Sequence, residues 1–150
     1  MNLYLKDSDG NWKSHRYETL SDLAGEFAKR NIKIGNRVTI GDYVRIGNDV
    51  KIGNRVRIGN DVVIPNAANI QLQYDLVTIN NLGSRNAPLS AVKIKDIIHV
   101  ATGCFSGTID EFEKRVKEVH EESEHGTAYR NAINYVKLHF SSHENFKSKR

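Results

Sequence analysis

The sequence predicts a mainly β fold built around a short parallel β-helix, followed by a β-hairpin and a pair of helices. Three observations support this prediction. From Ala28 to about Asn69 the chain repeats every six residues, with an apolar residue in the first and fifth positions of each hexad. Glycine recurs in the second position from Gly35 to Gly59. A period of six and columns of β-branched residues are typical of strands and do not fit an α-helix.

Each column of the hexad has an expected physical role. The isoleucines of the first position and the valines of the fifth should point inward, where β-branched side chains pack well on a pleated wall. Glycine in the second position and asparagine or aspartate in the third should supply the left-handed backbone of a corner. The fourth and sixth positions point outward. Three hexads make one coil, so residues one coil apart should stack about 4.8 Å from each other.

These tandem hexads resemble the hexapeptide-repeat, or left-handed β-helix, family. The resemblance covers about forty residues, and it implies left-handed coils and assembly into a homotrimer. Many members of that family transfer acyl groups, using a histidine base that projects from the coil or from an inserted loop. Here the repeats have no inserted loop, and no histidine occurs between Arg16 and Ile98. The same gap excludes a metal site made of three histidines from adjacent coils.

The elements on either side of the repeats divide the chain into three parts. Residues 1–30 are predicted to form a β-hairpin around the turn at residues 7–10, then a helix over residues 20–29 that plugs the open end of the coil. The β-helix is assigned to residues 28–82, with a loosened coil after Asn69. Residues 83–150 are predicted to contain a β-hairpin around Lys95 and Asp96, two helices and a basic tail. Thr108 and Glu111 have the spacing of a capping box at the first helix.

The C-terminal part carries a second, less specific resemblance. The phrases at residues 82–86 and 103–108, followed by Glu111 and Phe112, resemble the C-terminal part of small phage and prophage proteins. Those proteins also place this part after hexapeptide repeats. The resemblance implies a bacteriophage context and names no chemistry.

Composition limits the compartment and the partners. The net charge of +4 and the isoelectric point near 9.2 favour an anionic partner. The single cysteine, Cys104, excludes a disulfide within the chain, and the N-terminus lacks the order of a secretory signal. No apolar stretch is long enough to cross a bilayer. We therefore expect no membrane association and a place in the cytoplasm of a bacterium or a phage-infected bacterium.

Stacking of the hexads concentrates basic residues. One stack places Arg37 over Arg55 and Thr39 over Arg57, and another places Lys33 over Lys51 and Asn69. Residues 28–64 contain eight basic and three acidic side chains, a net charge of +5. Because like charges on adjacent strands repel each other, either solvent screens the arginines or an anion binds among them.

A polar loop after the repeats offers a second group of ligand candidates. Arg85 can grip a phosphate or carboxylate with two parallel hydrogen bonds, and Ser84 and Asn86 can add donors. A plainly exposed arginine is the alternative interpretation. Tyr43 and Tyr74 are candidates for stacking on a ligand.

His99 is the remaining candidate base, because it lies near Cys104 in the sequence, although a structural role is the alternative. His139 and His143 have helical metal-pair spacing but lack a third ligand, so we expect neither a metal nor a cofactor.

Together these features predict a phage-type, homotrimeric, non-enzymatic protein that binds a small anionic, nucleotide-like ligand. One concrete version is a sponge that sequesters a nucleotide signal of bacterial immunity. The expected ligand-binding residues are Arg37, Arg55, Arg57, Tyr43, Tyr74, Ser84, Arg85, Asn86 and His99. Two alternatives stay open: an acyltransferase that uses His99, and a structural or assembly module of a phage particle. Nucleic-acid binding is disfavoured, because few aromatic residues lie among the basic ones.

Overall fold

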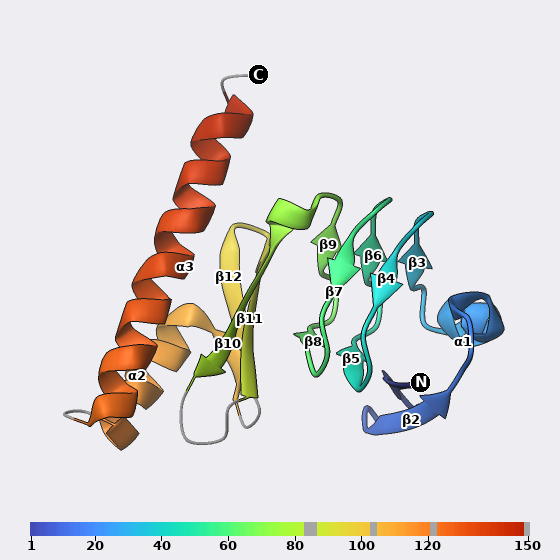
Figure 1. Ribbon diagram of the computed structural model, residues 1–150, viewed down its shortest axis with the longest axis horizontal. Helices are drawn as coiled ribbons and strands as arrows, with labels where there is room; N and C mark the ends of the chain where they lie inside the picture. Colours follow the sequence, from blue (N-terminus) through green and yellow to red (C-terminus); the bar gives the residue numbers. More distant parts are fainter. Residues whose placement is uncertain (83–86, 103–104, 121–122, 149–150) are drawn as a thin grey trace. The chain divides into compact units, whose positions relative to one another are not determined.

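The computed structural model describes residues 1–82, 87–102, 105–120 and 123–148 (Figure 1). The chain divides into two compact units. We call residues 1–76 the coil unit and residues 77–150 the C-terminal unit. Within the described residues, no helix is both long enough and apolar enough to cross a membrane.

The coil unit contains three sets of short parallel strands, which form the walls of a β-helix (Figure 1). The strands of one wall are separated by one coil in the sequence, as Lys33 pairs with Lys51 and Thr39 with Arg57. The predicted stacking register is therefore confirmed. The walls consist of β3 (Lys33–Ile34), β6 (Lys51–Ile52) and β9 (Asn69–Ile70); β4 (Thr39–Ile40) and β7 (Arg57–Ile58); and β5 (Val44–Ile46) and β8 (Val63–Ile64).

The apolar columns fill the inside of the coil, as predicted. From Ile40 to Ile64 in the first position, and from Val44 to Val62 in the fifth, every member of the two columns is buried. Backbone N–H groups of each coil donate to carbonyls of the next, for example from Gly41 to Ile58 at 2.8 Å. The interior is thus apolar and β-branched, and the hydrogen bonds run between coils.

The corners correct one expectation. The left-handed backbone lies at the fourth position of each hexad rather than at the second or third, with φ of 59° at Arg37 and 63° at Arg55. Close approach of the next coil requires glycine instead at Gly35, Gly41, Gly47 and Gly53. A Cβ on Gly35 would lie 2.8 Å from the backbone nitrogen of Asn54. The asparagine itself joins the coils, because Asn54 Oδ1 accepts the N–H of Asn36 at 2.7 Å.

The predicted N-terminal hairpin is present and also extends one wall of the coil. Strand β1 (Asn2–Lys6) pairs antiparallel with β2 (Trp12–Arg16) and parallel with β5, with Leu3 beside Val44. At the adjoining corner the Tyr43 N–H donates to the carbonyl of Asn2 at 2.9 Å. Asp42 Oδ1 accepts the Asn2 N–H at 2.7 Å, as Asn60 Oδ1 accepts that of Asp42. Strand β1 therefore occupies the place of a strand in a preceding coil.

The predicted helix over residues 20–29 is present as a 3₁₀ turn, η1 (Leu20–Leu23), that continues into α1 (Ala24–Lys29). The assignment of Ala28 to the first inward position of a hexad was wrong, since Ala28 lies in α1 and is exposed. Helix α1 is fastened by Arg30, whose Nε donates to the Lys6 carbonyl at 2.7 Å. The Arg30 Nη1 donates to the backbone carbonyl and the Oε2 of Glu26, each at 2.8 Å.

The coil ends at β9, followed by the short η2 (Gln73–Asp75). The Gln73 side chain closes the last strand of one wall: its Oε1 accepts the Arg57 N–H at 2.7 Å, and its Nε2 donates to the Arg57 carbonyl at 2.9 Å. The expected continuation of a loosened coil as far as Leu82 was wrong. Strand β10 (Leu76–Leu82) instead pairs with strand β11 in the sheet of the C-terminal unit.

The C-terminal unit is a four-stranded sheet with two helices. Its strands are β10, β11 (Ala87–Ile94), β12 (Ile97–Ala101) and β13 (Ser106–Thr108), adjacent in that order. The predicted hairpin is confirmed, with Ile94 paired with Ile97. Helix α2 (Ile109–His120) begins at the predicted capping box, where the Glu111 N–H donates to Thr108 Oγ1 at 3.2 Å. Helix α3 (Glu124–Ser148) extends beyond its predicted end near Phe140.

Candidate functional site

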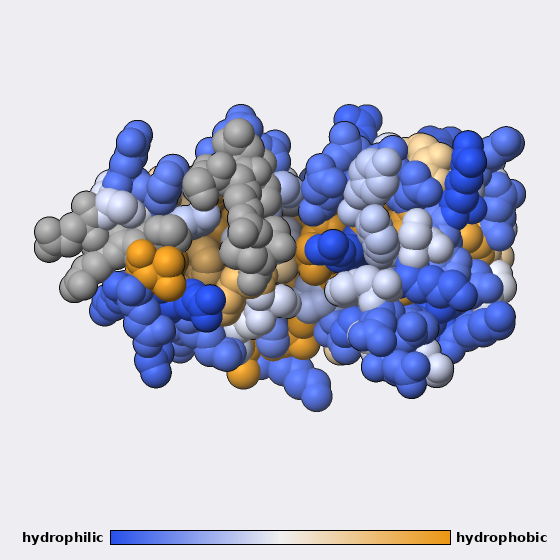
Figure 2. Space-filling model, turned by 90° about the horizontal axis from the view of Figure 1, so that it is seen from below, coloured by the Kyte–Doolittle hydropathy of each residue, from blue (hydrophilic) through white to orange (hydrophobic). Residues whose placement is uncertain are grey.

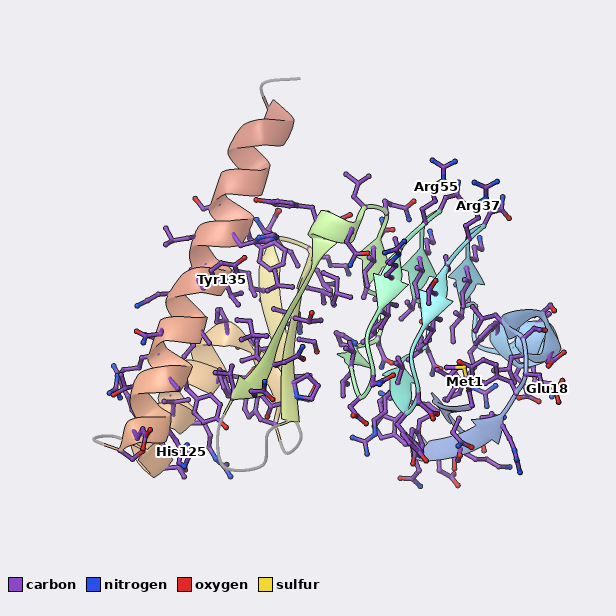
Figure 3. All side chains as sticks on the ribbon, viewed as in Figure 1. Met1, Glu18, Arg37, Arg55, His125 and Tyr135 are labelled. Atoms are coloured by element: carbon purple, nitrogen blue, oxygen red, sulfur yellow. The ribbon has the colours of Figure 1, made fainter. Side chains whose placement is uncertain are left out.

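Within the described residues of the coil, one corner and the walls beside it carry basic side chains and no acidic one. Arg37 and Arg55 lie one above the other at this corner, since the Arg55 N–H donates to the Asn36 carbonyl at 2.8 Å. Figure 3 shows both side chains projecting in the same direction. Lysines occupy the preceding wall and a third arginine the following one. We call this set the basic edge: Lys33, Arg37, Lys51, Arg55 and Arg57.

The hexad itself directs the corner arginines outward. Val38 and Val56, the residues that follow them, are in the inward-facing column, so the fourth position must face solvent. The left-handed backbone at Arg37 and Arg55 turns the chain at the corner, so that the side chain of the fourth position points outward and that of the fifth points inward. Successive coils repeat at about 4.8 Å, which lets two neighbouring guanidinium groups reach one anion.

The acidic residues of the coil lie at the other two corners. Asp42 lies at the corner between β4 and β5, and Asp61 lies at the equivalent corner of the next coil, between β7 and β8. Asp49 lies at the corner between β5 and β6. Asp42 and Asp49 accept hydrogen bonds, from the Asn2 backbone and from Asn31 Nδ2 at 3.0 Å respectively. Within the described residues, no ion pair involves an arginine of the basic edge. The separation leaves a local positive potential on this side of the coil.

The two tyrosines proposed for stacking lie elsewhere in the coil unit. Tyr43 is exposed at the corner of Asp42, and its ring centroid lies 6.4 Å from that of Tyr4. Arg45 lies over the same Tyr4 ring, with Cζ 5.3 Å from the centroid. Tyr43 therefore joins a different aromatic and cationic group from the basic edge. Tyr74 is exposed in η2, directly after the Gln73 that caps Arg57.

His99 belongs to the C-terminal unit. It lies in β12, half-buried, between its cross-strand partners Val92 and Thr108. Hydrogen bonds from the backbone and side chain of Thr108 lower the pKa of Glu111, and the charge of His99 adds to this effect. Ser84, Arg85, Asn86 and Cys104 lie outside the described residues.

Two members of the basic edge were absent from the predicted ligand-binding residues. Lys33 and Lys51 stack in register on the wall beside Arg37 and Arg55. Because the two lysines are one coil apart in the sequence, their stacking could be predicted. The sequence did not show that this stack lies beside the corner of the two arginines. Among the described residues, no group of three or more histidine, cysteine, aspartate or glutamate side chains is placed to hold a metal ion.

Comparison with known proteins identifies the repeats. Residues 31–66 match the family described as bacterial transferase hexapeptide (six repeats). Neither the curated proteins nor the solved structures contain a match to the chain.

Proposed function

We propose that the chain is a homotrimeric binding protein with left-handed coils. This proposal starts from the match of residues 31–66 to the family described as bacterial transferase hexapeptide (six repeats). Its ligand is a small anion held at the basic edge, and binding involves no catalysis. The observation that carries this proposal is the stacking of Arg37 on Arg55, neither of which has an ion pair within the described residues.

The arrangement suits a phosphate group. Guanidinium groups bind phosphate oxygens with parallel hydrogen bonds, and two of them one coil apart can share a single anion. Their backbones are fixed by hydrogen bonds between coils, so little freedom is lost on binding. Lys33, Lys51 and Arg57 add charge around the pair. A nucleotide therefore fits the proposal, and in a phage context its capture would sequester a signal.

The chemistry of the basic edge favours binding over catalysis. The five side chains of the basic edge are all lysines and arginines, which bind anions through charge-assisted hydrogen bonds. Acyl transfer would need a base such as His99, which belongs to the other unit. Turnover of an acyl-coenzyme A that disappears in His99→Ala would overturn the non-enzymatic part of the proposal.

The assembly and the ligand can be tested together. Native mass spectrometry of the full chain should show a trimer, and calorimetry should show binding of at least one of phosphate, pyrophosphate, ATP and a cyclic dinucleotide. Arg37→Gln and Arg55→Gln should each weaken that binding about tenfold, because each removes a charge-assisted hydrogen bond. Raising the salt concentration should also weaken it.

Arg16→Gln is the matched control, since Arg16 is an exposed arginine on the hairpin strand β2. It should bind the anion as the unaltered chain does. A chain that ignores the whole panel, or a double Arg37→Gln/Arg55→Gln variant with unchanged affinity, would refute the proposed site. A monomer that binds the anion normally would refute only the trimer.

A further inference from the structure

A pocket of about 450 Å³ opens at the N-terminal end of the coil, between the capping helix and the first turn of the repeats. Leu20, Ala24 and Phe27 line it from η1 and α1, and Ile34 and Val38 line it from the coil. Its volume is within the range of small-molecule sites.

The pocket exposes residues that the hexad pattern assigns to the core. Ile34 and Val38 are only half-buried, whereas Ile52 and Val56, one coil later in the same columns, are 3% and 0% exposed. The cause is the unequal closure of this end. Strand β1 covers the wall of β5, but β3 and β4 are outermost in their own sheets. Apolar surface therefore remains open beside the helix.

The rim of the pocket is polar and cationic. Arg37 and Asn36 line it from the corner, and Ser21 lines it from η1. Within the described residues, the Arg37 side chain has no ion pair. An apolar floor beside one unneutralised guanidinium group is complementary to a molecule with an apolar body and one anionic end.

We infer that this pocket binds a small amphiphilic carboxylate, with the apolar body against Ile34, Val38 and Phe27 and the carboxylate on Arg37. The inference deepens the proposed function, because Arg37 belongs to the basic edge. It adds a ligand class that the basic edge alone does not select. A purely polar anion would leave the floor wet, and a neutral apolar molecule would leave Arg37 unused.

The probe is 4-phenylbutyrate, and 4-phenylbutanol is its uncharged counterpart. Calorimetry on the full chain should show saturable binding of the acid and binding of the alcohol that is at least about tenfold weaker. Arg37→Gln should weaken the acid by a similar factor. Arg16→Gln should leave it unchanged, because Arg16 is an exposed arginine on β2 that does not line the pocket.

A matched pair of substitutions on α1 tests the floor of the pocket. Ala24→Leu fills the pocket, whereas Ala28→Leu makes the same change on the same helix at an exposed residue that does not line it. Ala24→Leu should weaken the acid by about tenfold or more, and Ala28→Leu should not. Thermal melting followed by circular dichroism verifies that both variants fold.

The outcomes separate this inference from the proposed function. If phosphate binding fails in every form but 4-phenylbutyrate binds through Arg37, the pocket stands and the basic edge does not. If phosphate binds and depends on both arginines while neither phenyl compound binds, the pocket inference is wrong. Equal binding of acid and alcohol, or equal effects of the two leucine variants, would also overturn it. So would self-association abolished by Ala24→Leu, because a second copy would then be the occupant.

Discussion

At the scale of single residues, the second position of each hexad faces the next coil. A Cβ on Gly41 would lie 2.7 Å from the backbone nitrogen of Asn60, closer than carbon and nitrogen can approach. The glycine at Gly59 has the same place in its hexad, but an added Cβ there would meet nothing within 4 Å. Neither glycine has a left-handed backbone. Glycine is therefore needed where another coil lies on it, and not at the end of the stack.

We predict that Gly41→Ala lowers the free energy of unfolding by about 1–3 kcal/mol, because the backbone of the next coil must move away. Gly59→Ala should change it by less than about 0.5 kcal/mol. Urea unfolding followed by the fluorescence of Trp12, the single tryptophan of the chain, measures both. Equal destabilisation by the two variants would show that backbone freedom, and not contact, is what the glycines provide.

A second residue-scale feature is His15 on β2. Its Nε2 is buried and, within the described residues, has no hydrogen-bond partner. Burial lowers the pKa of His15 below 6.5, and the nearby positive charges of Arg30, Lys13 and Lys29 lower it further. Glu26 acts in the opposite direction but does not overcome burial.

This shift predicts a pH dependence of stability. Between the lowered folded pKa of His15 and 6.5, the unfolded chain binds more protons than the folded one, so the free energy of unfolding decreases as the pH falls through that window. Above 6.5 the contribution of His15 is complete. Urea unfolding at pH 7.5 and at pH 5.5 should show the loss, and His15→Gln should reduce it. A loss of equal size in His15→Gln would assign the dependence to carboxylates instead.

At the scale of elements, the hairpin, the capping helix and the coil meet at Arg30. Its side chain, 12% exposed, donates to the end of β1 at Lys6 and to Glu26 in α1. Its backbone carbonyl accepts the Asp49 N–H of the coil at 2.9 Å. One residue therefore connects three elements that are far apart in sequence.

We expect Arg30→Gln to lower the free energy of unfolding by about 1–3 kcal/mol, because the Lys6 carbonyl loses a charged donor. Lys29→Gln is the matched control, since the side chain of Lys29 is 72% exposed. Its ion pair with Glu26 is at the surface, so its loss should cost less than about 1 kcal/mol. Trp12 fluorescence during urea unfolding reports both. An Arg30→Gln variant as stable as Lys29→Gln would contradict the role of Arg30.

The elements that the sequence predicted well are those with local or periodic signals. The six-residue period placed the walls in register, and the helix over residues 20–29 followed from its capping pattern. The parallel pairing of β1 with β5 was not predictable. Nothing in the sequence near Leu3 indicates that its partner lies in the coil, beyond the hairpin and helix α1. The closure of β7 by Gln73 depends on side-chain geometry at one position. In the sequence, the end of the coil near Gln73 was visible only as a break in the column of glycines.

The candidate site was predicted in the same uneven way. Periodicity stacked Arg37 on Arg55, and the structure has that stack. The neighbouring lysines were left out of the expected site, because the order of walls around the coil decides which stacks share a corner. The pocket beside Arg37 had no sequence signal, since it depends on how much of Ile34 and Val38 the helix leaves uncovered.

Gln73 supports a prediction about the end of the coil. Gln73→Ala should lower the free energy of local opening at Arg57 by about 1 kcal/mol, because the Arg57 N–H loses its acceptor. Hydrogen exchange followed by mass spectrometry should therefore show faster exchange in peptides that contain Arg57. Gln71→Ala is the control, since the Gln71 side chain contacts the Asn69 side chain and not the backbone of β7. Unchanged exchange at Arg57 in Gln73→Ala would show that the cap does not protect the strand.

At the scale of the whole molecule, the two units have separate cores. The coil unit is filled by the apolar columns of the hexads. The C-terminal unit is filled by a cluster from its sheet and helices, which includes Val100, Phe112 and Ile133. The face shown in Figure 2 is mainly hydrophilic, with limited hydrophobic patches between the polar side chains.

Separate cores predict separate responses to a core substitution. Ile133→Ala should destabilise the C-terminal unit by about 2–5 kcal/mol, since the side chain is 3% exposed and leaves a cavity. Hydrogen exchange in peptides of α2 and α3 should increase. The urea midpoint of Trp12 fluorescence, which reports the coil unit, should stay the same. A shift of that midpoint would show that the two units unfold together.

The corner at Arg37 and Arg55 also has a consequence for how such a chain changes length. Successive turns are related by a translation along the axis, and the hairpin and Gln73 act as terminators that do not depend on how many turns lie between them. Duplication of residues 37–54, the length of one coil, would add a third arginine to the stack of Arg37 and Arg55 and preserve the contacts at the two ends of the coil. Evolution or design can therefore change the number of charges along the basic edge only in steps of one full coil.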